Sequence, residues 1–73
     1  MESRYFSPIP NKVYSNINGM NYICLASKGQ CDGIFQAMTK SKWTFTAHGC
    51  HVFDNGKIEW NHSSDGHFEG VFK

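Results

Sequence analysis

His51-Val-Phe-Asp-Asn-Gly-Lys-Ile-Glu-Trp60 is the stretch of this 73-residue chain that decides its fold. Two short β-prone runs flank Asn55-Gly56, and both turn residues tolerate the positive φ of a two-residue type I′ turn. Counting outward from such a turn pairs Phe53 with Ile58, so that Phe53, Ile58 and Trp60 share one face of the hairpin. This stretch therefore predicts an antiparallel hairpin with that face buried.

Alternation and turns predict further strands on both sides of that hairpin. Trp43-Thr-Phe-Thr-Ala47 alternates large apolar with small polar residues, at the period of a strand. Earlier in the chain, Asn18-Gly19 separates two β-prone runs and predicts another hairpin, and Ser27–Gln30 is the next expected turn. Ser63–Gly66 is expected to be a turn before a last strand at 67–72.

Helical periodicity does not persist anywhere for more than about two turns, so the sequence predicts an all-β fold. We expect a small, strongly bent antiparallel sheet or a partly open barrel of roughly five to six short strands. Both prolines of the chain lie in Ser7-Pro-Ile-Pro10, where they exclude a helix or a central strand. Residues 1–11 are therefore expected to form an extended N-terminal arm, and residues 12–73 a single β domain.

The charge balance argues against several classes of partner. The formal net charge is +1, from 7 Lys and Arg spread along the chain and 6 Asp and Glu. This distribution lacks the basic tract of a polyanion-binding protein, and the acidic residues are too few for a DNA mimic. No apolar run approaches the roughly 20 residues of a membrane span, and the start of the chain has no signal-peptide pattern. We expect a soluble, cytosolic protein that contacts neither nucleic acid nor membrane.

The chain is rich in residues that bind soft metal ions. Seven candidates occur between positions 24 and 67: Cys24, Cys31, His48, Cys50, His51, His62 and His67. In a reducing cytosol three cysteines are not expected to form a disulfide framework, which leaves metal binding or burial as their roles.

Two placements bring four of these candidates together in pairs. If Ala26–Gly29 forms a four-residue turn, Cys24 and Cys31 oppose each other across a hairpin. His48 and Cys50 are expected to project to the same side, because they are two positions apart in a strand. The sequence thus predicts one structural zinc ion held by Cys24, Cys31, His48 and Cys50, with His51 and His67 as substitutes. The alternative is a metal-free protein whose cysteines pack as small buried residues and whose histidines lie at the surface or bond within the core.

Catalysis is the alternative to these binding roles. Cys24 with His48 is a conceivable pair of nucleophile and base. No nucleophile elbow, glycine-rich phosphate loop or His-Glu-x-x-His motif accompanies it. Trp43 and Trp60 are expected in the sheet core, because the stacking platforms of nucleic-acid-binding proteins normally sit among basic residues. The sequence therefore predicts a protein that is not an enzyme and that binds a macromolecular partner.

Four blocks of the sequence resemble small proteins carried by phages and mobile elements of Firmicutes. They are Asn16–Leu25, Lys42–Cys50, Asp54–Trp60 and Ser63–Phe68. In size, composition and motif order the chain is similar to anti-CRISPR inhibitors of type II effector nucleases. The resemblance implies stoichiometric binding to a CRISPR effector nuclease in the cytoplasm of a bacterial host, without DNA mimicry. The competing expectation is a β interaction module of a phage or mobile element, zinc-stabilised or metal-free, that binds another protein.

Overall fold

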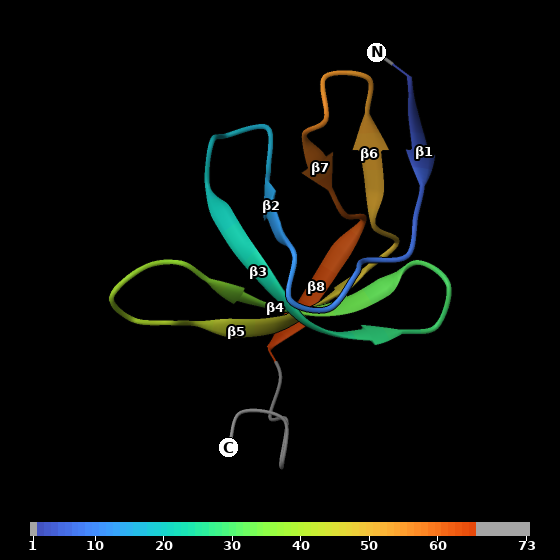
Figure 1. Ribbon diagram of the computed structural model, residues 1–73. Coiled ribbons are helices and arrows are strands. Elements are labelled where there is room, and N and C mark those ends of the chain that lie inside the picture. Colours follow the sequence, from blue (N-terminus) through green and yellow to red (C-terminus); the bar gives the residue numbers. More distant parts are fainter. Residues whose placement is uncertain (1, 66–73) are drawn as a thin grey trace.

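The computed structural model describes residues 2–65, which form an all-β fold (Figure 1). In chain order the strands are β1 (Ser3–Tyr5), β2 (Val13–Ser15), β3 (Asn21–Lys28), β4 (Asp32–Ala37), β5 (Thr44–His48), β6 (His51–Phe53), β7 (Ile58–Glu59) and β8 (His62–Asp65). The predicted fold class is confirmed, with eight short strands in the described residues. Within residues 2–65 there is no helix of the length and apolarity that a membrane crossing would take.

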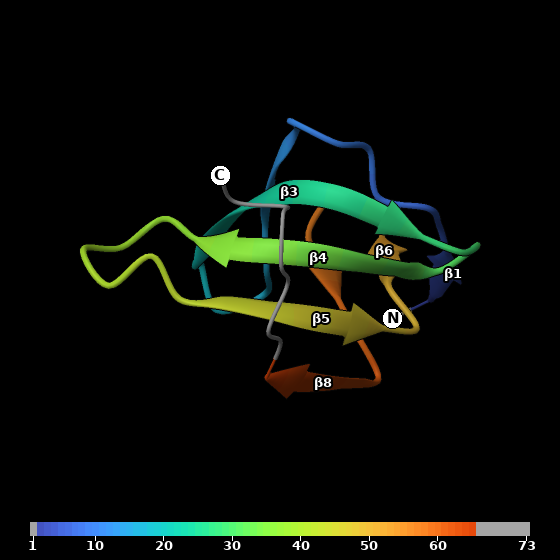
Figure 2. The ribbon, with the colours of Figure 1, turned by 90° about the horizontal axis from the view of Figure 1, so that it is seen from below.

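The strands are divided between two open antiparallel sheets. The five-stranded sheet has the order β2-β3-β4-β5-β8, and the three-stranded sheet has the order β1-β6-β7. Figure 2 shows β3, β4, β5 and β8 of the larger sheet side by side. Gly49, with a φ of +74°, turns the chain from β5 in the larger sheet to β6 in the smaller one. The structure thus has two sheets in place of the single bent sheet. An isolated parallel bridge between Asn16 and Ile58 joins them.

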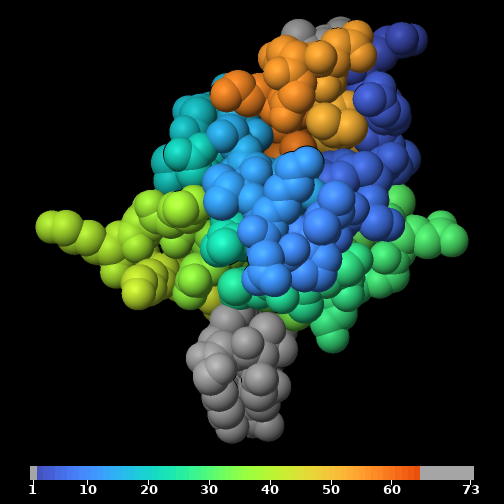
Figure 3. Space-filling model, in the orientation of Figure 1, coloured from blue at the N-terminus to red at the C-terminus, as the bar shows by residue number. Residues whose placement is uncertain are grey.

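The N-terminal segment is extended, as its prolines indicate, and it packs along the domain. β1 pairs with β6. Pro8 is fully buried next to Gly33, where a Cβ atom would lie 2.9 Å from the Pro8 ring. Farther along, the Asn11 N–H donates to the Cys24 carbonyl at 2.8 Å. Figure 3 shows this segment in blue across the front of the molecule, so residues 2–11 contribute to the surface of the folded unit.

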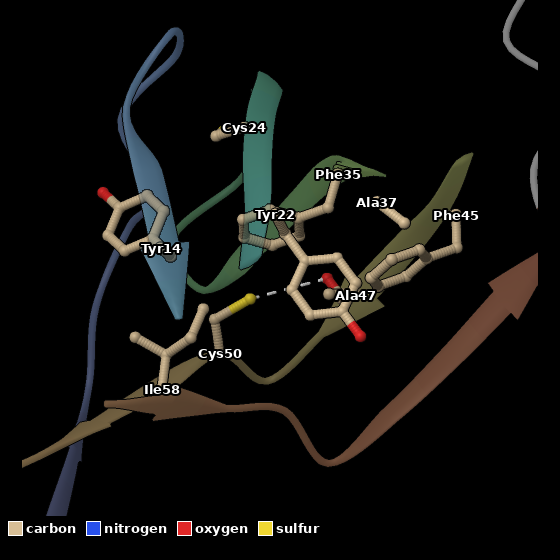
Figure 4. Packing of buried hydrophobic residues seen from close by; sticks show 9 residues of the cluster. All are labelled: Tyr14, Tyr22, Cys24, Phe35, Ala37, Phe45, Ala47, Cys50 and Ile58. Atoms are coloured by element: carbon tan, nitrogen blue, oxygen red, sulfur yellow. Dashed lines mark hydrogen bonds between the residues drawn. The ribbon is translucent and has the colours of Figure 1, made fainter. Parts of the chain in front are cut away.

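An aromatic cluster lies at the centre of the core (Figure 4). Phe35 and Phe45 are fully buried and stack with their ring centroids 5.9 Å apart. Trp60 stacks on the Phe35 ring at 5.9 Å, and Tyr22 meets that ring edge-on at 6.4 Å. The buried residues of the core come from both sheets: Tyr14, Tyr22, Cys24, Phe35, Ala37, Phe45, Ala47, Cys50 and Ile58. Burial of these rings removes a large apolar area from water, which drives the sheets together.

The predicted alternation in β5 is confirmed for the residues inside the strand. Phe45 and Ala47 are fully buried on one face. Trp43 precedes the strand and is 47% exposed, although its ring still stacks on Phe45 with centroids 4.7 Å apart. The strand period therefore holds from Thr44, where β5 begins.

The β6–β7 hairpin has a different turn from the one predicted. Val52 pairs with Ile58, and the Gly56 N–H donates to the Phe53 carbonyl at 2.9 Å, so the loop has three residues. Gly56 has a φ of +85°, whereas Asn55 lacks the positive φ that a type I′ turn requires. The register is shifted by one residue, which changes the side chains that share a face. The predicted pairing of Phe53 with Ile58 is therefore wrong, and Val52 packs against the core instead.

The hairpin predicted near the start of the chain and the turn predicted near its end have different outcomes. The hairpin predicted around Asn18-Gly19 is confirmed, since β2 and β3 pair antiparallel across that turn. The turn predicted at Ser63–Gly66 is wrong for its described residues, because Ser63 and Ser64 lie in β8 and pair with β5. The predicted last strand at 67–72 lies outside the described residues.

Candidate functional site

The register of β3 and β4 does not place Cys24 opposite Cys31. Cys24 pairs with Phe35, and a bulge follows between Cys24 and Ala26. Strand pairing then continues to Lys28 opposite Asp32, which leaves a shorter turn than the one assumed. Gly29, with a φ of +73°, permits this tight turn. The predicted opposition of Cys24 and Cys31 is therefore wrong.

Cys24 and Cys50 belong to the core, and Cys31 is half-buried in the β3–β4 turn. The Cys24 thiol donates to the Ala26 carbonyl at 3.4 Å. The Cys50 N–H donates to the Cys31 carbonyl at 2.6 Å, so these two residues are neighbours through their backbones. Burial raises the pKa of the Cys24 thiol, and burial together with the charge of Asp32 raises the pKa of Cys50 to about 12. Without a bound metal both thiols are therefore protonated near pH 7, and a zinc ion would displace their protons on binding.

His48 lies on the opposite side of the chain from Cys50. Its Nδ1 is 3.1 Å from Asp32 Oδ2, its Nε2 is 3.2 Å from Ser64 Oγ, and its ring stacks on His62 with centroids 4.6 Å apart. Cys50 instead faces the core. The left-handed conformation of Gly49 breaks the strand alternation between them. The prediction that His48 and Cys50 project to the same side is therefore wrong.

The substitute ligands do not complete a four-ligand set among the described residues. His51 Nδ1 is 2.9 Å from the Gly49 carbonyl, and the ring packs edge-on against Tyr5. His67 lies outside the described residues. Among residues 2–64, whose side chains the structure describes, His, Cys, Asp and Glu form no group of three or more that could hold a metal ion. The structural zinc ion stays a prediction, which metal analysis of protein purified without a polyhistidine tag would test.

The bend at Gly49 is held by one carboxylate. The Gly49 N–H donates to Asp32 Oδ1 at 3.2 Å, and His48 bonds the other carboxylate oxygen. Both hydrogen bonds hold the pKa of Asp32 below its usual range, and the bond from the Gly49 N–H has the larger effect. The carboxylate therefore stays ionised near neutral pH and keeps the bend between the sheets in place.

Gly49→Ala is expected to lower the free energy of unfolding by about 2 kcal/mol or more. A left-handed non-glycine residue costs about 1–2 kcal/mol. In addition, the new Cβ would overlap with Nδ2 and Cγ of Asn61, which forces that side chain to move. Gly29→Ala is a matched control, because Gly29 has a similar φ of +73° and nothing within 4 Å of the added Cβ. Urea titrations of both variants measure the difference, and equal losses would show that the Asn61 contact costs nothing.

A groove of about 570 Å³ opens where the two sheets meet the N-terminal segment. Its lining combines apolar side chains with basic ones: Arg4, Phe6, Ile9, Lys12, Val13, Tyr14, Ser15, Val52, Asn55, Gly56, Lys57 and Ile58. Ile9 is 55% exposed and Val13 is 47% exposed, so the groove offers aliphatic surface to a partner. The charged residues along it, Arg4, Lys12 and Lys57, are all cationic.

Side-chain contacts hold the floor of this groove in place. The Ile9 N–H donates to the Tyr14 hydroxyl at 3.0 Å, which fixes the segment after Pro8 against β2. The Lys12 ammonium lies 5.4 Å from the centre of the Tyr14 ring, within the range of a cation–π interaction. Tyr14 itself is only 9% exposed and packs in the core. The exposed apolar surface of the groove is therefore aliphatic. Contacts with the buried Tyr14 side chain hold the segment that carries it in place.

Sequence reasoning did not find this groove, because its residues come from two distant segments. Positions 4–15 and 52–58 are brought together by the β1–β6 pairing and by the bridge between Asn16 and Ile58. One repeated pattern was present in the sequence, a lysine before a β-branched strand residue, in Lys12-Val13 and Lys57-Ile58. That pattern is too common to predict a binding site by itself.

A second exposed surface lies at the turn between β4 and β5. Met38 is 56% exposed, and Trp43 lies at the other end of the turn, with Lys40 and Lys42 between them. The turn projects from the side of the sheets in Figures 1 and 2. Its lysines are exposed but do not line the groove, so they provide controls for charge substitutions there.

The fold and the groove describe a small all-β domain with a basic and aliphatic surface at the meeting of two sheets. No protein-family model, curated protein or solved structure matches this chain.

Proposed function

We propose that this protein acts by stoichiometric binding to another protein, and that the groove is its contact surface. The observation that carries the proposal is the exposed aliphatic surface of Ile9 and Val13 in the groove. The cationic residues Arg4, Lys12 and Lys57 border this surface. Burial of aliphatic surface supplies affinity, and the surrounding cations select an acidic partner and speed its association. This combination is typical of a protein-binding surface with a polar rim.

We propose a type II CRISPR effector nuclease of the bacterial host as the partner, following the sequence resemblance. The basic character of the groove favours an acidic patch on the nuclease protein over its nucleic-acid channel, because that channel is itself positively charged. With a formal net charge of +1 the chain does not imitate DNA. Binding on the protein surface would block guide loading, target binding or the conformational change that precedes cleavage.

The test is inhibition of nuclease cleavage by purified protein at increasing molar ratios. Inhibition is expected to be complete near one inhibitor per nuclease, with no further increase on longer incubation. The combined variant Arg4→Glu, Lys12→Glu and Lys57→Glu is expected to weaken inhibition at least about tenfold, because all three charges then repel an acidic partner.

The combined variant Lys28→Glu, Lys40→Glu and Lys42→Glu is the matched control. It makes the same change in net charge at exposed lysines that do not line the groove, and it is expected to inhibit like the unchanged protein. Full cleavage at a large molar excess of inhibitor would exclude this nuclease as the partner. Progressive inactivation by trace amounts would show an enzyme and contradict stoichiometric binding.

A further inference from the structure

β2 is an edge strand of the five-stranded sheet, and it pairs on one side with β3. The Cys24 N–H donates to the Lys12 carbonyl at 2.9 Å, and the Asn16 N–H donates to the Met20 carbonyl at 2.9 Å. Along an antiparallel strand, backbone groups point alternately toward one neighbour and the other. The N–H and C=O of Val13 and the N–H of Ser15 therefore point away from β3, toward the open edge.

This open edge belongs to the groove, since both Val13 and Ser15 line it. β7 does not pair along β2, because the contact between the two sheets here is one isolated bridge, at Asn16 and Ile58. Unpaired N–H and C=O groups on an edge strand are a ready template for another extended chain. The groove thus offers backbone hydrogen bonds together with its aliphatic and cationic side chains.

We infer that the groove binds an extended acidic segment of the partner protein, which adds to β2 as a further strand. The inference rests on the proposed function, and it specifies the chemistry of the partner's contacting segment. Strand addition supplies affinity through main-chain hydrogen bonds, while pockets for alternate side chains supply specificity. Alternate apolar side chains of the segment lie on Ile9 and Val13, and its Asp or Glu residues face Arg4, Lys12 and Lys57.

The aromatic residues of the groove argue against a nucleic acid as the occupant. Single-stranded nucleic acid stacks its bases on exposed aromatic faces. Tyr14 is buried, with the Lys12 ammonium over its ring, and Phe6 is partly buried with its ring centroid 5.4 Å from that of Tyr14. The surface left open is aliphatic, which suits the side chains of a peptide better than the faces of bases.

The experiment is nuclear magnetic resonance of the ¹⁵N-labelled full chain titrated with a synthetic probe. The probe is a blocked heptapeptide in which Asp or Glu alternates with Val, and the same peptide with Lys at the acidic positions is the control. The acidic peptide is expected to shift the Val13 and Ser15 amide signals and to slow their hydrogen exchange at least about tenfold. Its binding is expected to weaken with added salt, because three cations contribute to it.

Val13→Pro removes the outward N–H without removing a β2–β3 hydrogen bond, and proline is tolerated on an edge strand. It is expected to weaken binding of the acidic peptide at least about tenfold. Val13→Thr keeps both the N–H and the branched shape, so its effect measures the change of side chain alone. It is expected to weaken binding less than Val13→Pro, which also removes the main-chain hydrogen bond. Since Val13→Pro could also disturb folding, the amide exchange measured on the unchanged chain provides a separate test.

Three results would overturn the inference: unchanged Val13 and Ser15 amides at saturating acidic peptide, equal binding of the basic peptide, or oligouridine binding at these residues in place of the peptide. Failure of strand addition can be told apart from failure of the proposed function. Nuclease inhibition that survives Val13→Pro would leave the proposed function standing and remove strand addition. Peptide binding at β2 without nuclease inhibition would keep the inference and remove the nuclease as partner.

Discussion

Phe35→Ala is expected to lower the free energy of unfolding by about 3–5 kcal/mol, the usual cost of deleting a fully buried phenyl ring. Phe35 is 0% exposed, and its ring contacts those of Phe45, Trp60, Tyr14 and Tyr22. These neighbours come from four strands or their flanks, so they cannot all move inward to fill the cavity. At about 0.05–0.15 kcal/mol per residue, a domain of this size has little stability beyond that loss.

Met38→Ala is the control for this substitution. Met38 directly follows β4, the strand that carries Phe35, but it is 56% exposed, and its truncation is expected to change stability by less than about 0.5 kcal/mol. Urea titrations followed by tryptophan fluorescence and far-UV circular dichroism measure both variants. A loss below about 1 kcal/mol for Phe35→Ala would contradict its place at the centre of the core.

Alkaline pH is expected to destabilise the protein through Cys50. Its pKa rises from an ordinary 9.0 to about 12, chiefly because of burial. Below pH 9 the thiol is protonated in both the folded and the unfolded chain, and the stability is fully present. As pH rises above 9 the unfolded chain releases this proton first, so stability falls until pH passes the folded pKa. From this group the loss is about 2 kcal/mol at about pH 10.5 and about 4 kcal/mol near pH 12.

Burial also raises the pKa values of Cys24 and Tyr22, so these groups add to the loss in the same direction. Cys50→Ala removes the largest contribution and is expected to flatten the decline between about pH 8.5 and 10.5 by up to about 2 kcal/mol. Urea titrations under a reducing agent at several pH values measure the slope. Equal slopes for the unchanged protein and for Cys50→Ala would show that this thiol is not buried in the core.

The fold class could be predicted because it depends on local patterns. Alternation in Trp43–Ala47 and the glycine-containing turns at Asn18-Gly19 and Asn55-Gly56 each predicted strands where the structure has them. The hairpin registers, in contrast, could not be predicted from these local patterns. A loop of two residues and a loop of three are compatible with the same Asn-Gly pair, and the difference is only whether Asn55 takes a positive φ. Packing of Val52 and Ile58 on the core decides between them.

The predicted ligand set shows the same limit. The distance between Cys24 and Cys31 depended on the length of one turn, which the continuation of β3 to Lys28 changes. The relation of His48 to Cys50 depended on the conformation of Gly49, whose left-handed φ is stabilised by hydrogen bonding of its N–H to Asp32. Neither the turn length nor the conformation of Gly49 can be inferred from the spacing of the Cys and His residues. Spacing therefore identified candidate ligands, but not the side of the sheet that each side chain faces.

The sequence by itself determined that this chain is a small all-β protein, because strand periodicity, turn residues and the absence of sustained helical periodicity act over only a few residues. The tertiary structure alone decided that the strands form two sheets, that Cys24 and Cys50 are buried thiols, and that Arg4, Lys12 and Lys57 border one groove. These features depend on contacts between residues far apart in the chain. Such contacts are selected by the burial of the shared aromatic core, to which both sheets contribute, and no local pattern encodes that choice.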